Sequence, residues 1–162
     1  MNMIILKQLA ILSALAGAIL GLVSLIPYVA YISFLVAFAF LSAILLFYLK
    51  KNDLIGIINP QEGAIYGAVI GVVSFAAFLV VLAPIASIIG LIFKGYPLGF
   101  FGYLFNNIGS FFFATLPLAV FAVLMSALFN GFTGMVTAWI CELVTGEKKE
   151  NNQNNSIDFE IK

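Results

Sequence analysis

Long uncharged stretches dominate the chain and predict its helices. Residues 8–49 carry no charged side chain. As one helix they would be about 60 Å long, twice the ~30 Å hydrocarbon core of a membrane. The stretch must therefore fold back once, and Pro27 is the natural place for a helix to end. We expect two membrane spans, at about 5–26 and 28–49.

A third span is expected at about 62–83, after a polar loop, and Pro84 should end or kink it. The following residues, 85–115, are apolar but are interrupted by glycine, proline and asparagine. Irregular backbone does not face lipid. This segment therefore either lies at the outer interface as short helices or re-enters the membrane where the bundle covers it.

The last span fits two registers. Pro117 suits the first turn of a helix and predicts a span at about 117–143. The alternative is a crossing at 108–129 followed by an interfacial helix, favoured by an apolar stripe of Phe132, Met135, Val136, Trp139, Ile140 and Leu143. We prefer 117–143, since it brings into the bundle the small residues Ala127, Gly131, Gly134 and Ala138.

Small residues recur every four positions in two matching stretches. Shifting 14–25 by 50 residues onto 64–75 superposes Ala, Gly, Ala, Gly, Val and Ser. This is the small-xxx-small pattern of packed membrane helices. We expect spans one and three to meet at these faces, so that leucine at Gly67 or Gly71 forces them apart. The predicted packing residues are Gly17, Gly21, Gly63, Gly67, Gly71, Gly131 and Gly134.

Lysine placement predicts the orientation. Lys7, Lys50, Lys51, Lys148 and Lys149 flank one set of helix ends, which by the positive-inside rule places both termini in the cytoplasm. The expected fold is an all-α membrane protein whose four transmembrane helices form two tandem hairpins, a parallel repeat. Residues 1–145 would form this domain, and 146–162 a polar, disordered cytoplasmic tail.

Composition limits the chemistry. The chain is 64% hydrophobic and 9% charged, with a net charge of zero, no histidine and one cysteine, Cys141. The commonest general base and metal ligand is therefore missing, and there is no basic face for nucleic acid. We expect no catalytic residues, no metal, no cofactor and no enzymatic activity.

The polar residues inside the predicted spans are uncharged: Ser13, Ser24, Ser42, Ser74, Ser126, Asn130, Thr133 and Thr137. Serine and threonine in membrane helices usually bond to their own backbone or join helices. A candidate polar site is formed by Ser24 and Ser74, at matching positions of the repeat, together with Asn130, whose amide needs partners at mid-depth. Packing between helices is the alternative role for Asn130.

A tight proline turn, a second span ending in Lys50-Lys51, and Asn59-Pro60-Gln61-Glu62 leading into a glycine-rich helix resemble small four-pass bacterial membrane proteins of uncharacterised function. The resemblance brings no activity with it. Two functions stay open. One is a structural or accessory subunit in the bacterial cytoplasmic membrane, embedded in the lipid bilayer as a homo-oligomer or bound to another membrane protein. The other is a small oligomeric channel or transporter for a neutral or apolar solute.

Overall fold

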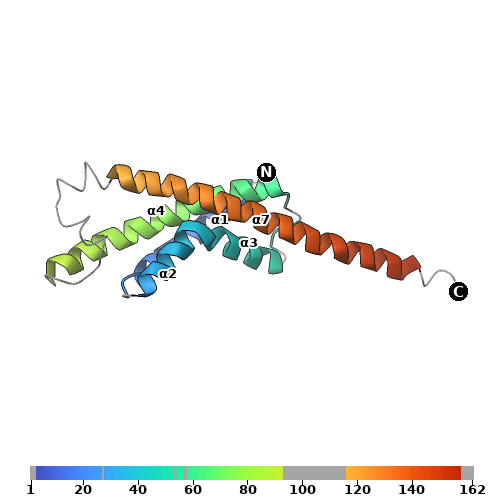
Figure 1. Cartoon of the computed structure of the whole chain (residues 1–162), viewed down its shortest axis with the longest axis horizontal. Coiled ribbons are helices and arrows are strands. Elements are labelled where there is room, and N and C mark those ends of the chain that lie inside the picture. Colours follow the sequence, from blue (N-terminus) through green and yellow to red (C-terminus); the bar gives the residue numbers. More distant parts are fainter. Residues whose placement is uncertain (1–2, 27, 53, 57, 93–115, 158–162) are drawn as a thin grey trace.

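The structure, a computed structural model, describes residues 3–26, 28–52, 54–56, 58–92 and 116–157 (Figure 1). These residues form helices and connecting turns, and no strand is present among them. The helices are α1 (Met3–Val23), α2 (Val29–Leu35), the π-helix η1 (Val36–Phe40), α3 (Leu41–Lys51), α4 (Pro60–Ile92) and α7 (Leu116–Ile157).

The predicted fold class, an all-α membrane protein with four spans, is confirmed by helix length and composition. Four apolar stretches are long enough to cross a membrane: Ile5–Val23, Val29–Lys51, Pro60–Ala86 and Leu116–Val144. Helix α7 is described from Leu116 onward and contains the preferred register, 117–143, but the choice between the two registers stays a prediction. The residues that would start the alternative crossing, 108–115, lie outside the described residues.

The turn between the first two spans lies where proline predicts it. The Ser24 backbone N–H donates to the Leu20 carbonyl, and the next two N–H groups bond three residues back, which tightens the last turn of α1. Tyr28 then has a φ of 70°, a left-handed conformation that is uncommon for a residue with a side chain. Tyr28 is 86% exposed, as expected for an aromatic residue at a membrane surface.

Two helices run further than the sequence predicts. Pro84 does not end the third span, since α4 continues through it to Ile92, and a kink at Pro84 stays a prediction. Neighbouring groups and small local adjustments allow a proline inside membrane helices. Residues 146–157, expected to be disordered, continue α7. Lengthening an existing helix requires no new nucleus, so α7 continues here although the segment contains glycine and four asparagines, which are weak helix formers. Residues 158–162 lie outside the described part of the chain.

Helix α4 is the centre of the bundle and packs against both α1 and α7. Gly17 of α1 contacts Ser74 of α4, and four residues later Gly21 contacts Phe78. The contacts advance in the same direction along both helices, so α1 and α4 are parallel. Contacts between α4 and α7 advance in opposite directions, so these helices are antiparallel. The second span runs parallel to α7, because Ala37 bonds to Ser126 and Ala39 to Thr133. The four spans therefore alternate in direction. Their assembly as two tandem hairpins stays a prediction, because the close partner of α1 is α4.

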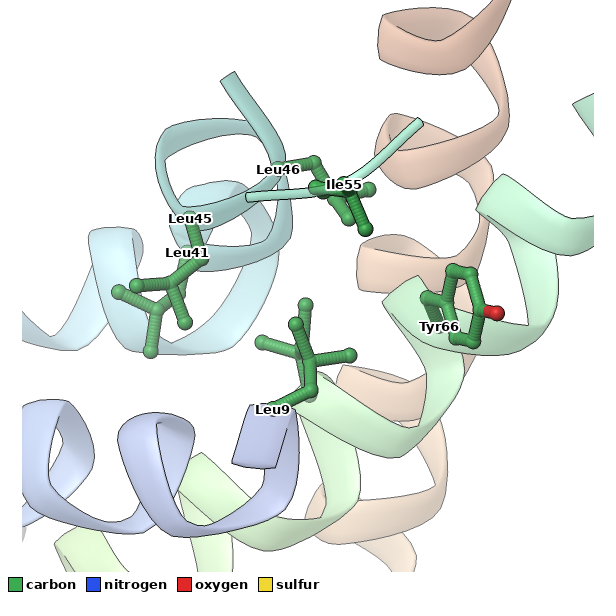
Figure 2. Close-up of a cluster of buried hydrophobic side chains, with 7 residues drawn as sticks. Leu9, Leu41, Leu45, Leu46, Ile55 and Tyr66 are labelled. Carbon is green, nitrogen blue, oxygen red and sulfur yellow. The ribbon is translucent and has the colours of Figure 1, made fainter. Parts of the chain in front are cut away.

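Two apolar clusters fill the bundle. The first joins α1, α3, α4 and the loop that follows α3, through Leu9, Leu41, Leu45, Leu46, Ile55, Tyr66 and Ile70 (Figure 2). The second includes the buried residues Ala37, Phe75, Phe78 and Leu82. The loop is held to α3 because the Lys50 ammonium donates to the Gly56 carbonyl at 3.2 Å and the Asn52 amide to the Tyr48 carbonyl at 2.8 Å. The polar loop thus contributes Ile55 to the core.

Candidate functional site

Glycines of α4 lie directly against the backbone of α7. A Cβ built on Gly71 would be 2.6 Å from the Ser126 carbonyl oxygen, and one on Gly63 would be 2.7 Å from the Gly134 carbonyl oxygen. Between them, Gly67 faces the Asn130 carbonyl and the Cα of Gly131. Real Cβ atoms are essentially never found at such distances, so each of these positions requires a glycine, which has no side chain. We call this surface, Gly63, Gly67 and Gly71 against Ser126–Ala138, the α4–α7 glycine contact.

The α1 glycines meet α4 at a different place. Gly17 lies against the backbone of Ser74, and a Cβ on Gly21 would be 2.9 Å from the Phe78 carbonyl oxygen. The expectation that leucine at Gly67 or Gly71 would force spans one and three apart is therefore wrong. These two residues keep α7 close to α4. The repeat places both glycine rows at equal sequence positions, but α4 lies between α1 and α7 and turns its own glycines toward α7.

The Asn130 side chain is inserted into the backbone of the second span. Its Oδ1 accepts the Ser42 backbone N–H at 2.9 Å, and its Nδ2 donates to the Phe38 carbonyl at 2.9 Å. In an α-helix the N–H of Ser42 would bond directly to the carbonyl of Phe38, four residues earlier. The carboxamide takes the place of that single bond with two bonds of its own. A side chain entering the i→i−4 ladder is a known cause of a local break.

Three hydroxyl groups complete this polar cluster. The Thr133 hydroxyl donates to the Ala39 carbonyl at 2.9 Å. Ser42 Oγ lies 2.7 Å from the Asn130 carbonyl and 2.6 Å from Thr133 Oγ1. Ser126 Oγ is 3.3 Å from the Gly71 carbonyl and 3.5 Å from that of Ala37. The carbonyls that the π-helix exposes are thus bonded by side chains of α7. We call Ser42, Ser126, Asn130 and Thr133 the midplane polar cluster.

The cluster lies at mid-depth of the apolar spans. Phe40, two residues before Ser42, is the central residue of Val29–Lys51, and Asn130 bonds to this part of the span. Unsatisfied backbone groups are most costly there, because no water is available to bond them. Asn130, Ser42 and Ser126 are fully buried. Among the described residues, every buried side-chain nitrogen or oxygen has a hydrogen-bond partner.

The predicted polar site divides in the structure. Ser24 is buried and donates to the Leu20 carbonyl of its own helix at 2.8 Å. Ser74 Oγ lies 3.5 Å from the Gly71 carbonyl, the same oxygen that Ser126 approaches. The structure therefore places Ser74 beside the midplane polar cluster and leaves Ser24 in a local bond of α1. Matching positions in the repeat did not produce a shared site.

Sequence reasoning identified each polar residue of the cluster but not the break that it supports. The π-helix Val36–Phe40 is a run of valine, alanine and phenylalanine with no glycine or proline. Its cause, the amide of Asn130, lies on another helix far along the chain. The useful signal was the single asparagine in a largely apolar span, because its amide requires hydrogen-bond partners and can find them across a helix interface.

The described lysine and glutamate side chains near the helix ends do not enter this cluster. Lys7, Lys50 and Glu62 belong to the ends of α1, α3 and α4, which the apolar cluster around Leu9 and Tyr66 brings together. Within the described residues no group of three or more histidine, cysteine, aspartate or glutamate side chains could hold a metal ion. The cluster is thus a set of neutral donors and acceptors that join α7 to η1, α3 and α4.

The packing side of α7 and its apolar side are separate. Gly131, Gly134 and Ala138 are buried against α4, whereas the stripe expected for an interfacial helix is mainly exposed. Phe132, Met135, Trp139, Ile140 and Leu143 face outward, where a membrane helix meets lipid or another protein.

Comparison with families of known proteins, with curated proteins and with solved structures gave no match to this chain. Of the resemblance to four-pass bacterial proteins, the structure supports one feature, the four apolar helices of membrane-spanning length.

Proposed function

We propose that this chain is a non-enzymatic structural or accessory subunit of a bacterial cytoplasmic membrane complex, with both termini in the cytoplasm. The observation that carries the proposal is the midplane polar cluster, in which Asn130, Ser42 and Thr133 bond to helix backbone and to each other. The polar chemistry of the interior is used to hold helices together. The orientation rests on Lys7, Lys50 and Lys51 at one end of the bundle.

The surface left for a partner is apolar. Exposed residues include Ile11, Leu15 and Ile19 on α1 and Phe132 and Trp139 on α7. Such helix faces suit lipid or the transmembrane helices of another protein, where association depends on close packing. A second copy of the chain or a different membrane protein would bind through them.

Isolation in a gentle detergent tests this proposal. The tagged chain is purified from its native membrane and the mass of the intact complex is measured. A second protein that co-purifies at fixed stoichiometry supports the subunit role, provided that this protein is lost from the Gly67→Leu variant and retained by the Gly56→Leu variant. Gly56 is the matched control, because a Cβ there meets no atom within 4 Å. A bare monomer from native membranes would contradict the proposal.

A small oligomeric channel or transporter for a neutral solute is the second candidate. One observation favours it: the second span is interrupted at mid-depth by η1, and transporters build substrate sites from discontinuous helices near the midplane. A homo-oligomer without other subunits, together with solute flux in liposomes, would establish it.

The two functions also differ in the segment between α4 and α7. Residues 93–115 lie outside the described residues, so the interfacial and re-entrant alternatives both stay predictions. Cysteines placed at Gly99 and Asn107 should react readily with a membrane-impermeant maleimide added outside if the segment is interfacial, as the subunit role expects. Protection at both positions would favour a re-entrant pore segment.

A further inference from the structure

We propose that the Asn130 side chain acts as a wedge: it maintains the π-helical break in the second span at the membrane midplane. Because of this break, the outer half of the span, α2, is rotated about the span axis relative to the inner half, α3. The proposal concerns the conformation of the span and holds for either function above. It starts from the inserted carboxamide: Ser42 N–H to Oδ1 at 2.9 Å, and Nδ2–H to the Phe38 carbonyl at 2.9 Å.

The exposed sides of the two halves are out of phase. On α3, Ile44 and Tyr48 are 51% and 55% exposed. A continuous α-helix would carry this side back to Ala37 and Ser33, seven and eleven residues before Ile44. These two residues are instead buried, at 0% and 3% exposed. On α2 the outward side passes through Tyr31, Ile32 and Leu35.

One residue of offset accounts for much of this difference. A π-turn places an additional residue in the helix, and each residue of an α-helix turns the chain by about 100°. The five-residue π-helix Val36–Phe40 therefore rotates α2 about the span axis with respect to α3. The rotation places Phe34 against α4, where its ring lies 5.6 Å edge-on from Phe75. The joint thus decides which side of α2 faces the bundle.

The Asn130 carboxamide has a further hydrogen-bond partner on its own helix. Asn130 Nδ2 also lies 3.1 Å from the Ser126 carbonyl, one turn back on its own helix. If the carboxamide withdrew to this bond, Ser42 N–H and the Phe38 carbonyl would be free to bond each other directly. This exchange would replace the two bonds of the carboxamide with one backbone bond and would leave Oδ1 without the Ser42 N–H, so the printed hydrogen bonds favour the inserted arrangement. Helix α3 stays fixed, because Leu41, Leu45 and Leu46 are packed in the core.

Backbone NMR of the whole chain in lipid nanodiscs, with a lipid-soluble spin probe, tests the joint. The probe, a doxyl-labelled stearic acid, broadens amide signals on the lipid-facing side of each helix. In the native chain Ile32 and Leu35 should broaden together with Ile44 and Tyr48, while Ser33 and Ala37 should stay sharp. A single continuous α-helical phase from 29 to 51 in the native chain would overturn the proposal without any variant.

Asn130→Ala removes the wedge and adds no bulk beside Gly67 and Gly71. The broadened side of α2 should then rotate by about 100°, so that Ser33 and Ala37 broaden and the pattern on α3 is unchanged. Thr137→Val is the matched control, since the Thr137 hydroxyl donates to the Thr133 carbonyl of its own helix at 2.7 Å. It should keep the native phase. An Asn130→Ala variant that folds and retains the offset would show that the π-helix does not depend on the wedge, contrary to the proposal.

Discussion

Helix α7 is held on two sides by contacts of different kinds. Toward α4 it presents small residues, and the two backbones touch where Gly67 and Gly71 have no side chain. Toward the second span it presents a carboxamide and hydroxyls that bond to broken helix backbone. The glycine contact depends on the absence of atoms and admits no replacement. The polar contact depends on directional bonds, and several of its members have alternative partners.

This difference predicts that glycine substitutions are the more damaging. The largest effect is expected for Gly67→Leu, whose side chain would collide with the Asn130 carbonyl and the Cα of Gly131. Backbone cannot move aside as a flexible side chain can, so we expect a loss of about 3 kcal/mol or more, and a melting temperature about 10 °C lower. Scanning fluorimetry of Trp139 in detergent measures it. Gly56→Leu, which meets nothing, should melt as the native chain does; equal losses in both variants would mean that close packing at Gly67 is unimportant.

Removal of the wedge should cost less. Asn130→Ala loses the bonds to Ser42 and Phe38, but these two backbone groups can then bond each other. We expect a loss of about 1–2 kcal/mol, near the upper end for hydrogen bonds between membrane helices. The same melting assay tests it, and a loss as large as that of Gly67→Leu would mean that the span cannot close its own ladder.

The smallest effects should separate bonds between helices from bonds within one helix. Ser42→Ala removes a hydroxyl that reaches Asn130 and Thr133 on α7, and should cost about 0.6 kcal/mol. Thr137→Val removes a bond within α7 and should stay within about 0.5 kcal/mol of the native chain. The order Ser42→Ala above Thr137→Val is the quantity to measure, by chemical denaturation in mixed micelles. The reverse order would contradict the division between the two kinds of contact.

The sequence predicts the elements of this fold better than their arrangement. Charge-free length and Pro27 are local signals, and the four apolar spans follow from signals of this kind. The glycine rows also identify residues at helix interfaces, because small residues are enriched where the backbones of membrane helices approach closely. The choice of partner is not local: Gly67 faces α7 and Gly17 faces Ser74 of α4 because of how three helices cross.

The π-helix is the part that no local pattern contains. Residues 36–40 have an ordinary apolar sequence, and the break arises where Asn130 of a distant helix enters the ladder. Predicting it requires the depth and rotation of α7 relative to the second span. The extension of α4 beyond Pro84 has a related reason, since a proline in lipid can be accommodated by its surroundings and the sequence does not state what these are.

The central claim is that α4 uses one face for α1 and another for α7. The direct test is a set of electron paramagnetic resonance distances between spin labels at the exposed positions Leu15 on α1, Val72 on α4 and Leu128 on α7, with Cys141 replaced by alanine. Introducing Gly67→Leu should lengthen the Val72–Leu128 distance by about 2 Å, the range over which interhelical spacing varies with the side chains between helices, and leave Leu15–Val72 unchanged. A longer Leu15–Val72 distance with Val72–Leu128 unchanged would contradict the account.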